Sequence, residues 1–130
     1  MSSQPKSAPQ ITSQIEQCIE NCLYCHRLCL EAIMYCLEMG GQHADSSHLQ
    51  LLLDCTEICQ TSANFMLRGS ELHAALCDVC AKVCERCAES CEQFGEDAKM
   101  QACAAICHRC AESCQLMVVN VAQKVQLDSQ

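Results

Sequence analysis

Nearly all of the sixteen cysteines of this 130-residue chain recur at intervals of three or four residues. They fall into four groups separated by segments without cysteine: Cys18, Cys22, Cys25, Cys29 and Cys36; Cys55 and Cys59; Cys77, Cys80, Cys84, Cys87 and Cys91; Cys103, Cys107, Cys110 and Cys114. Steps of three and four residues keep side chains on one face of an α-helix. Each group therefore predicts a helix that carries a stripe of thiols.

Glycines separate the cysteine groups and mark the expected helix ends, at Gly40, Gly41, Gly69 and Gly95. We predict helices at about 8–39, 46–68, 71–93 and 96–124, a flexible tail over 1–10 and a frayed end over 125–130. Short connections make successive helices antiparallel. The predicted fold is all-α: a single domain, residues 11–124, forming an up-down-up-down antiparallel four-helix bundle with cysteines lining its core.

Helix starts can be predicted from capping residues. Ser7 is the expected N-cap of the first helix, and Ser46 or Ser47 that of the second. The acidic pair Glu96 and Asp97 is expected to begin the fourth helix, because negative charge stabilises a helix N-terminus.

An internal repeat lies in the third and fourth groups. Residues 84–91 read CERCAESC and residues 107–114 read CHRCAESC, with one difference in eight positions. The spacing CxxCxxxC is thus used twice as a module.

The charge and the composition narrow the class of protein. The formal net charge of -8 argues against nucleic acid or an anionic membrane as partner, because both attract clustered Lys and Arg. The first ten residues lack the apolar run of a secretory signal, and no stretch is long and apolar enough to cross a membrane. We therefore expect a cytoplasmic protein whose thiols stay reduced.

Three roles for so many thiols can be weighed. Cysteine can act as a small apolar core residue, but Ala, Val or Leu would pack without the risk of oxidation. Disulfides within one stripe would distort the helix, because thiols one turn apart are too widely spaced, while bridges between helices remain geometrically possible. The third role is a metal site.

Soft thiolates favour Cu(I), Zn(II) or iron–sulfur clusters. Structural zinc sites gather four ligands near turns, and an iron–sulfur protein needs only four or eight cysteines. Four thiolates around Zn(II) leave a buried charge of -2, whereas one Cu(I) per thiolate leaves none. A column of thiols therefore favours several Cu(I) ions, roughly one per cysteine.

The stripes Cys18-x3-Cys22-x2-Cys25-x3-Cys29 and Cys77-x2-Cys80-x3-Cys84-x2-Cys87-x3-Cys91 resemble those of the cytosolic copper storage proteins of bacteria. The resemblance covers residues 11–121. It implies a four-helix bundle that binds many Cu(I) ions along its core and assembles as a homotetramer, with copper chaperones or recipient cuproproteins as further partners. With only Cys55 and Cys59, the second helix contributes fewer ligands than the first or third.

Other soft donors fall near the cysteine faces at both predicted ends of the bundle. One end would carry Met39, His43, His48 and Met100, and the other would carry Met66, His73 and Met117. Thioether and imidazole bind Cu(I) more weakly than thiolate, which suits ligands that pass the ion inward. We favour the first end as the route for copper, although these methionines would equally well plug the bundle. His108 is expected to point outward and His26 to lie on a flank.

The sequence gives no support for catalysis, because many equivalent cysteines are the opposite of one activated nucleophile. Three functions therefore remain: a Cu(I) store, a zinc or general soft-metal buffer of the metallothionein type, and a thiol-redox protein.

Overall fold

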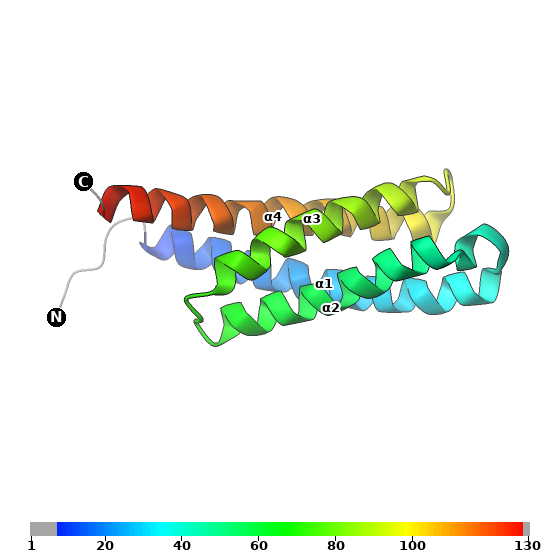
Figure 1. Ribbon diagram of the computed structural model, residues 1–130, viewed down its shortest axis with the longest axis horizontal. Helices are drawn as coiled ribbons and strands as arrows, with labels where there is room; N and C mark the ends of the chain where they lie inside the picture. The colour runs from blue at the N-terminus through cyan, green and yellow to red at the C-terminus, as the bar shows by residue number, and fades with distance from the viewer. Residues whose placement is uncertain (1–7, 129–130) are drawn as a thin grey trace.

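The computed structural model describes residues 8–128, with side chains described for residues 12–122. Its elements are α1 (Ala8–Met39), a short 3-10 helix η1 (Gly41–Ala44), α2 (Ser46–Leu67), α3 (His73–Glu92) and α4 (Ala98–Asp128). The four long helices run antiparallel to their neighbours in sequence and enclose one core (Figure 1). The predicted all-α four-helix bundle is confirmed.

The two ends of the bundle differ in what connects there. The α1–α2 connection with η1 and the α3–α4 turn lie together at one end, which we call the η1 end (Figure 1). The start of α1, the end of α4 and the α2–α3 connection lie at the other, which we call the terminal end (Figure 1).

Helix starts depart from the predicted caps. Asp45, and not Ser46 or Ser47, is the N-cap residue of α2, and it accepts a hydrogen bond from the Ser47 hydroxyl at 3.0 Å. The fourth helix begins at Ala98 because Asp97 caps it, accepting the Met100 backbone N–H at 3.0 Å. Ser7 lies outside the described residues.

Two other helix bounds differ from the sequence-based expectation by two residues or more. The third helix begins at His73 instead of 71, because Ser70 Oγ accepts the Leu72 N–H at 3.1 Å and holds a turn after Gly69. Gly69 has a φ of +67°, a conformation that glycine adopts without strain. The fourth helix continues to Asp128 instead of ending near residue 124.

The core is filled mainly by sulfur. All sixteen cysteines are at most 1% exposed, and buried alanines such as Ala63 and Ala88 let the helices approach closely. The bulkiest fully buried side chains are Leu52, Met100 and Met117, none of them aromatic. The thiols are therefore the main packing material between the helices as well as candidate ligands.

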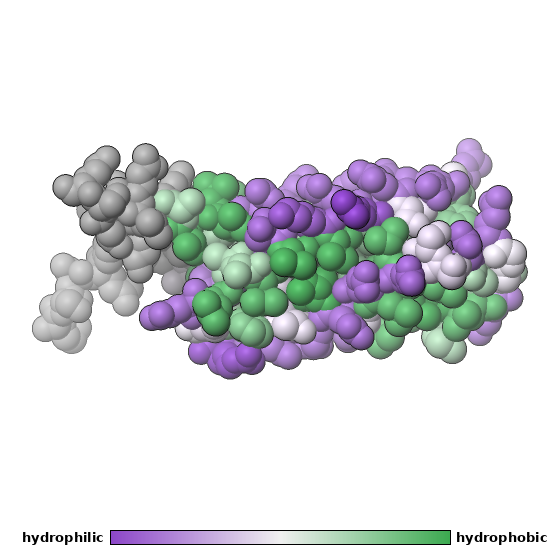
Figure 2. Space-filling view, in the orientation of Figure 1, coloured by the Kyte–Doolittle hydropathy of each residue, from purple (hydrophilic) through white to green (hydrophobic). Residues whose placement is uncertain are grey.

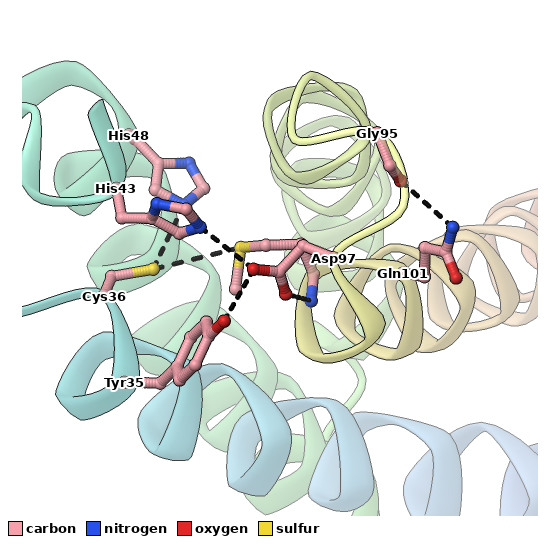
Figure 3. Close-up of polar contacts among 8 residues, drawn as sticks. Tyr35, Cys36, His43, His48, Gly95, Asp97 and Gln101 are labelled. Carbon is pink, nitrogen blue, oxygen red and sulfur yellow. Dashed lines mark hydrogen bonds and ion pairs between the residues drawn. The ribbon is translucent and has the colours of Figure 1, made fainter. Parts of the chain in front are cut away.

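The Asp97 carboxylate holds the η1 end together. Its Oδ2 accepts the Tyr35 hydroxyl at 2.6 Å and lies 3.1 Å from His43 Nε2, while its Oδ1 caps α4 (Figure 3). The Tyr35 hydrogen bond is the largest of several contacts that lower the pKa of Asp97. One side chain thus ties α1, η1 and α4 to each other.

Replacing Asp97 is expected to destabilise the protein. Asp97→Ala should cost about 1–2 kcal/mol from the lost cap alone, measured by denaturant unfolding, whereas Glu96→Ala at an exposed neighbour should cost little. Because the folded-state pKa of Asp97 is lowered, its contribution is present above the unfolded pKa of about 3.9 and is lost as the pH falls through the folded value. Equal unfolding curves for the two variants would contradict this role.

Among the helices that the structure describes, none is long and apolar enough to cross a membrane.

Candidate metal centre

The stripes of the four helices converge on a common axis and bring thiols of different helices into contact. The sulfur of Cys55 on α2, for example, lies 3.7 Å from those of Cys25 on α1 and Cys84 on α3, and 3.9 Å from that of Cys107 on α4. The shortest such separation given by the contacts between cysteines is 3.6 Å, well beyond the ~2.05 Å of a disulfide bond. All sixteen cysteines are free thiols in this structure.

Among the thiol sets in the described residues whose sulfur atoms all lie within 4.8 Å of one another, five sets of four cysteines form a continuous series. In order from the terminal end to the η1 end they are Cys22, Cys80, Cys110 and Cys114; Cys59, Cys80, Cys84 and Cys110; Cys25, Cys55, Cys59 and Cys84; Cys25, Cys29, Cys55 and Cys107; Cys29, Cys87, Cys103 and Cys107. Each set shares two cysteines with the next. The core is therefore a chain of tetrahedra joined along their edges.

Shared edges decide which ions can fill neighbouring sets. A metal–sulfur bond of about 2.3 Å corresponds to a tetrahedron edge of about 3.8 Å, close to the observed separations, and centres in adjoining tetrahedra would then lie about 2.7 Å apart. At such a distance the repulsion between two divalent ions is four times that between two monovalent ions. Zinc can consequently occupy only alternate sets, three of these five, whereas Cu(I) can occupy neighbouring ones.

The buried thiols must lose protons to bind metal. Burial is the largest cause that raises the pKa of Cys36, to about 11, followed by the nearby Cys103 and Asp97. The neighbouring Cys103 and Cys87 also raise the pKa of Cys91. These thiols are protonated at neutral pH, so metal uptake at them releases protons and becomes more favourable as the pH rises.

At the η1 end the column finishes in mixed donors. Cys36 Sγ lies 3.5 Å from His48 Nε2 and 3.9 Å from Met100 Sδ (Figure 3). Burial is the main cause that lowers the pKa of His48, which favours the neutral imidazole that can bind a metal. A pocket of about 360 Å³, lined in part by His48, Ser90 and Phe94, opens beside this cluster.

Two other predicted donors at the η1 end are placed differently. Met39, the last residue of α1, is 54% exposed and does not join the buried cluster. His43 is engaged by Asp97 and packs against the Phe94 ring with 4.2 Å between centroids, and neither of these contacts is with a thiol.

At the terminal end two thioethers close the column. Met66 and Met117 are buried, and Met66 Sδ lies 3.9 Å from Cys77 Sγ. His73 is only partly buried, and its Nδ1 lies 2.9 Å from the Ser70 carbonyl oxygen of its own turn. The structure therefore brings Met66 and Met117 to the column and leaves His73 bonded locally.

The remaining histidines lie where the sequence predicted. His108 is exposed and its Nε2 lies 3.2 Å from a Glu92 carboxylate oxygen. His26 lies on a flank, with Nδ1 2.8 Å from the Thr56 carbonyl oxygen of α2. Neither reaches the thiols through these contacts.

Sequence reasoning missed Ser90 and Tyr35. Ser90 Oγ lies 2.6 Å from His48 Nδ1 and fixes the imidazole with its other nitrogen toward Cys36. Ser90 precedes Cys91 in the repeated octapeptide. A polar residue next to the thiol stripe was the sequence feature that could have indicated its contact with a donor. Tyr35 and Asp97 are 62 positions apart in the sequence, so no local sequence pattern indicates their contact.

Comparison with known proteins decides the family. Residues 11–119 match the family model described as copper storage protein. This chain belongs to the copper storage protein family. The matched residues include every cysteine of the chain, so the whole thiol column lies within the region that this copper storage family member shares with its family.

Relatives with solved structures share the fold of this copper storage family member over most of their length. Nmul_A1745 from Nitrosospira multiformis is 45% identical, with a TM-score of 0.79 over 83% of this chain and 97% of its own. The Cu(I)-bound copper storage protein BsCsp3 is 35% identical, with a TM-score of 0.75 over 81% of this chain and 98% of its own.

A curated relative is matched over a shorter region. The cysteine-rich protein YhjQ of Bacillus subtilis is 36% identical over 66 residues, which span 51% of this chain and 61% of the relative. The chain thus matches about three fifths of that relative's length.

Proposed function

We propose that this protein stores and sequesters Cu(I), holding many ions as thiolate complexes along the axis of its bundle. The observation that carries the proposal is the chain of edge-sharing thiol tetrahedra. A shared edge means that each bridging thiolate serves two ions, an arrangement that suits closely spaced monovalent soft cations. Membership of the copper storage family and the Cu(I)-bound relative BsCsp3 support the same cargo.

The proposed ligands are the sixteen cysteines, with about one copper per cysteine at full loading, because each thiolate then neutralises one Cu(I). Each thiol gives up its proton as it binds, so filling the column leaves no net charge in the core. We assign His48 and Met100 as accessory donors at the η1 end, and Met66 and Met117 at the terminal end. The role is storage, with no catalytic reaction assigned.

The test is an anaerobic titration of the reduced protein with Cu(I) against a competing chelator, run in parallel with Zn(II). We expect Cu(I) uptake to continue well beyond the number of zinc ions, because zinc is limited to alternate thiol sets. Equal capacities for the two metals would favour a soft-metal buffer of the metallothionein type. Cu(I) uptake that stops at two or three ions would rule out storage.

The proposed location is the cytoplasm, and the proposed partners are donor chaperones and recipient cuproproteins. The sixteen thiols must stay reduced to bind Cu(I), and a reducing compartment keeps them so. A thiol assay on protein freshly taken from cells that finds most cysteines oxidised would contradict this location and favour a thiol-redox role.

We propose that the chain assembles as a homotetramer. The outer face of α1 carries Leu23, Leu30, Met34 and Leu37, which are 37–59% exposed, and apolar residues form a broad band along the bundle (Figure 2). Contiguous exposed apolar surface of this kind marks a protein interface. Light scattering should give about 57 kDa, four times the chain mass of 14.3 kDa. A monomer mass would contradict the assembly.

A further inference from the structure

The thiol column has an approximate internal two-fold symmetry. In the repeated octapeptides, each residue of α3 has its counterpart in α4 23 positions later. Each cysteine position of α1 likewise corresponds to the α2 position 30 residues later. Equivalent contacts then agree to within 0.2 Å in sulfur–sulfur distance: Cys25–Cys107 with Cys55–Cys84, Cys29–Cys103 with Cys59–Cys80, Cys29–Cys107 with Cys59–Cys84, Cys25–Cys29 with Cys55–Cys59, and Cys36–Met100 with Met66–Cys77.

The four-thiol sets obey the same relation. Exchanging each residue for its counterpart turns the set Cys25, Cys55, Cys59 and Cys84 into Cys55, Cys25, Cys29 and Cys107. The same exchange turns the set Cys59, Cys80, Cys84 and Cys110 into Cys29, Cys103, Cys107 and Cys87. Both images are themselves sets found in the structure. The two halves of the column are therefore built to the same plan.

The two-fold relation fails on α2 near the η1 end. The α2 counterparts of Cys18 and Cys22 are His48 and Leu52. Leu52 is 0% exposed and belongs to the same core cluster as the thiols. A buried leucine thus stands where the symmetry calls for a thiol.

This substitution leaves one thiol set incomplete. Cys22 lies 3.6 Å from Cys110 and 3.7 Å from Cys114 by sulfur–sulfur distance, and completes the set of this series that is nearest the terminal end. The image of that set is Leu52, Cys87, Cys91 and Cys103. Two of its three thiols, Cys87 and Cys103, also belong to the adjoining set. Cys91 is therefore the one thiol that the incomplete set does not share with it. At the terminal end the corresponding set has two thiols that the adjoining set does not share, Cys22 and Cys114, and Cys114 also lies 3.7 Å from Cys18 by sulfur–sulfur distance.

We propose that Leu52 makes the cluster of Cys87, Cys91 and Cys103 a three-thiol site from which Cu(I) is released first. The inference rests on the proposed storage of Cu(I). An ion in this site would have three thiolate ligands, two of them shared with the neighbouring ion, and the Leu52 side chain in place of a fourth ligand. The corresponding ion at the terminal end would have four thiolate ligands. The same protein thus holds a readily exchanged ion at the η1 end and a tightly held one at the terminal end.

The decisive variant is Leu52→Cys, which restores the missing thiol in an otherwise unchanged column. Its matched control is Leu53→Cys, which adds a thiol at the neighbouring position, 48% exposed on the outside of α2. Each protein is loaded with Cu(I) without oxygen, and its capacity and the rate of copper transfer to excess chelator are measured. We expect Leu52→Cys to bind about one more ion than the wild type and to lose the fastest phase of release, at least several-fold slower. The control should keep that phase.

A second variant tests the same idea from the other end. Cys22→Leu reproduces at the terminal end the arrangement around Leu52, so it should bind about one ion fewer and gain a second fast phase of release. Circular dichroism of the apo proteins checks that each variant folds. Unchanged release kinetics in both folded variants would overturn the inference while leaving storage intact. Failure of storage itself would appear separately, as a wild type that binds only two or three ions.

Discussion

Loading with Cu(I) is expected to raise the thermal unfolding midpoint of this protein by about 15 °C or more. A single site at a free ligand concentration one thousand times its Kd stabilises the folded state by about 4 kcal/mol, and each kcal/mol moves the midpoint by about 4 °C in a domain of this size. The column offers several sets that exist only when the four helices are assembled. Binding and folding are therefore strongly linked.

The apo protein provides the reference for this measurement. Circular dichroism should already show a helical protein without metal, because buried aliphatic and alanine side chains such as Leu52, Ala63 and Ala88 pack without any ion. Zinc should raise the midpoint less than copper, since it fills only alternate sets. A random-coil apo protein, or the same midpoint with and without copper, would contradict the expected behaviour.

The second large effect concerns where along the column a thiol is removed. Cys55→Ala is expected to lower the Cu(I) capacity by about two ions, because Cys55 belongs to two adjoining sets and bridging thiolates serve two ions. Cys36→Ala should lower it by one ion at most, because the contacts of Cys36 are with His48 and Met100 at the η1 end.

The capacity of each variant is read from the end point of the Cu(I) titration against a chelator. Both substitutions remove a single buried sulfur atom and should destabilise the apo fold by similar amounts, about 1 kcal/mol, so the comparison isolates the position in the column. Equal losses of capacity would mean that the thiols act independently, and would contradict an edge-sharing core.

The cysteine spacing predicted the fold and the lining of the core because helical period is a local property. Steps of three, four and seven residues along α1 and α3 suffice to place every one of their thiols inside. Which thiols meet across helices depends on the register between helices, and no local pattern carries that. The sets that join Cys25 with Cys84, or Cys29 with Cys87, therefore needed the structure.

The ends of the bundle were harder to predict for a similar reason. Met39 shares the phase of the α1 stripe, but the helix runs past the core and leaves this side chain 54% exposed. Asp97 was expected only to add charge at a helix start, whereas its bonds to Tyr35 and His43 depend on how three elements meet. Helical phase gives direction around the axis and says nothing of where along it the core stops.

The start of α1 and the end of α4 lie at the same end of the bundle, and this has a practical consequence. Because α1 begins and α4 finishes at the terminal end, a tag, a fluorescent reporter or a surface linker would be joined on the side of the bundle away from the pocket beside His48 (Figure 1). Protein tethered in this way would present its η1 end to the solution. Immobilised layers of it would therefore suit a reusable copper-capturing electrode or resin, with each molecule oriented the same way.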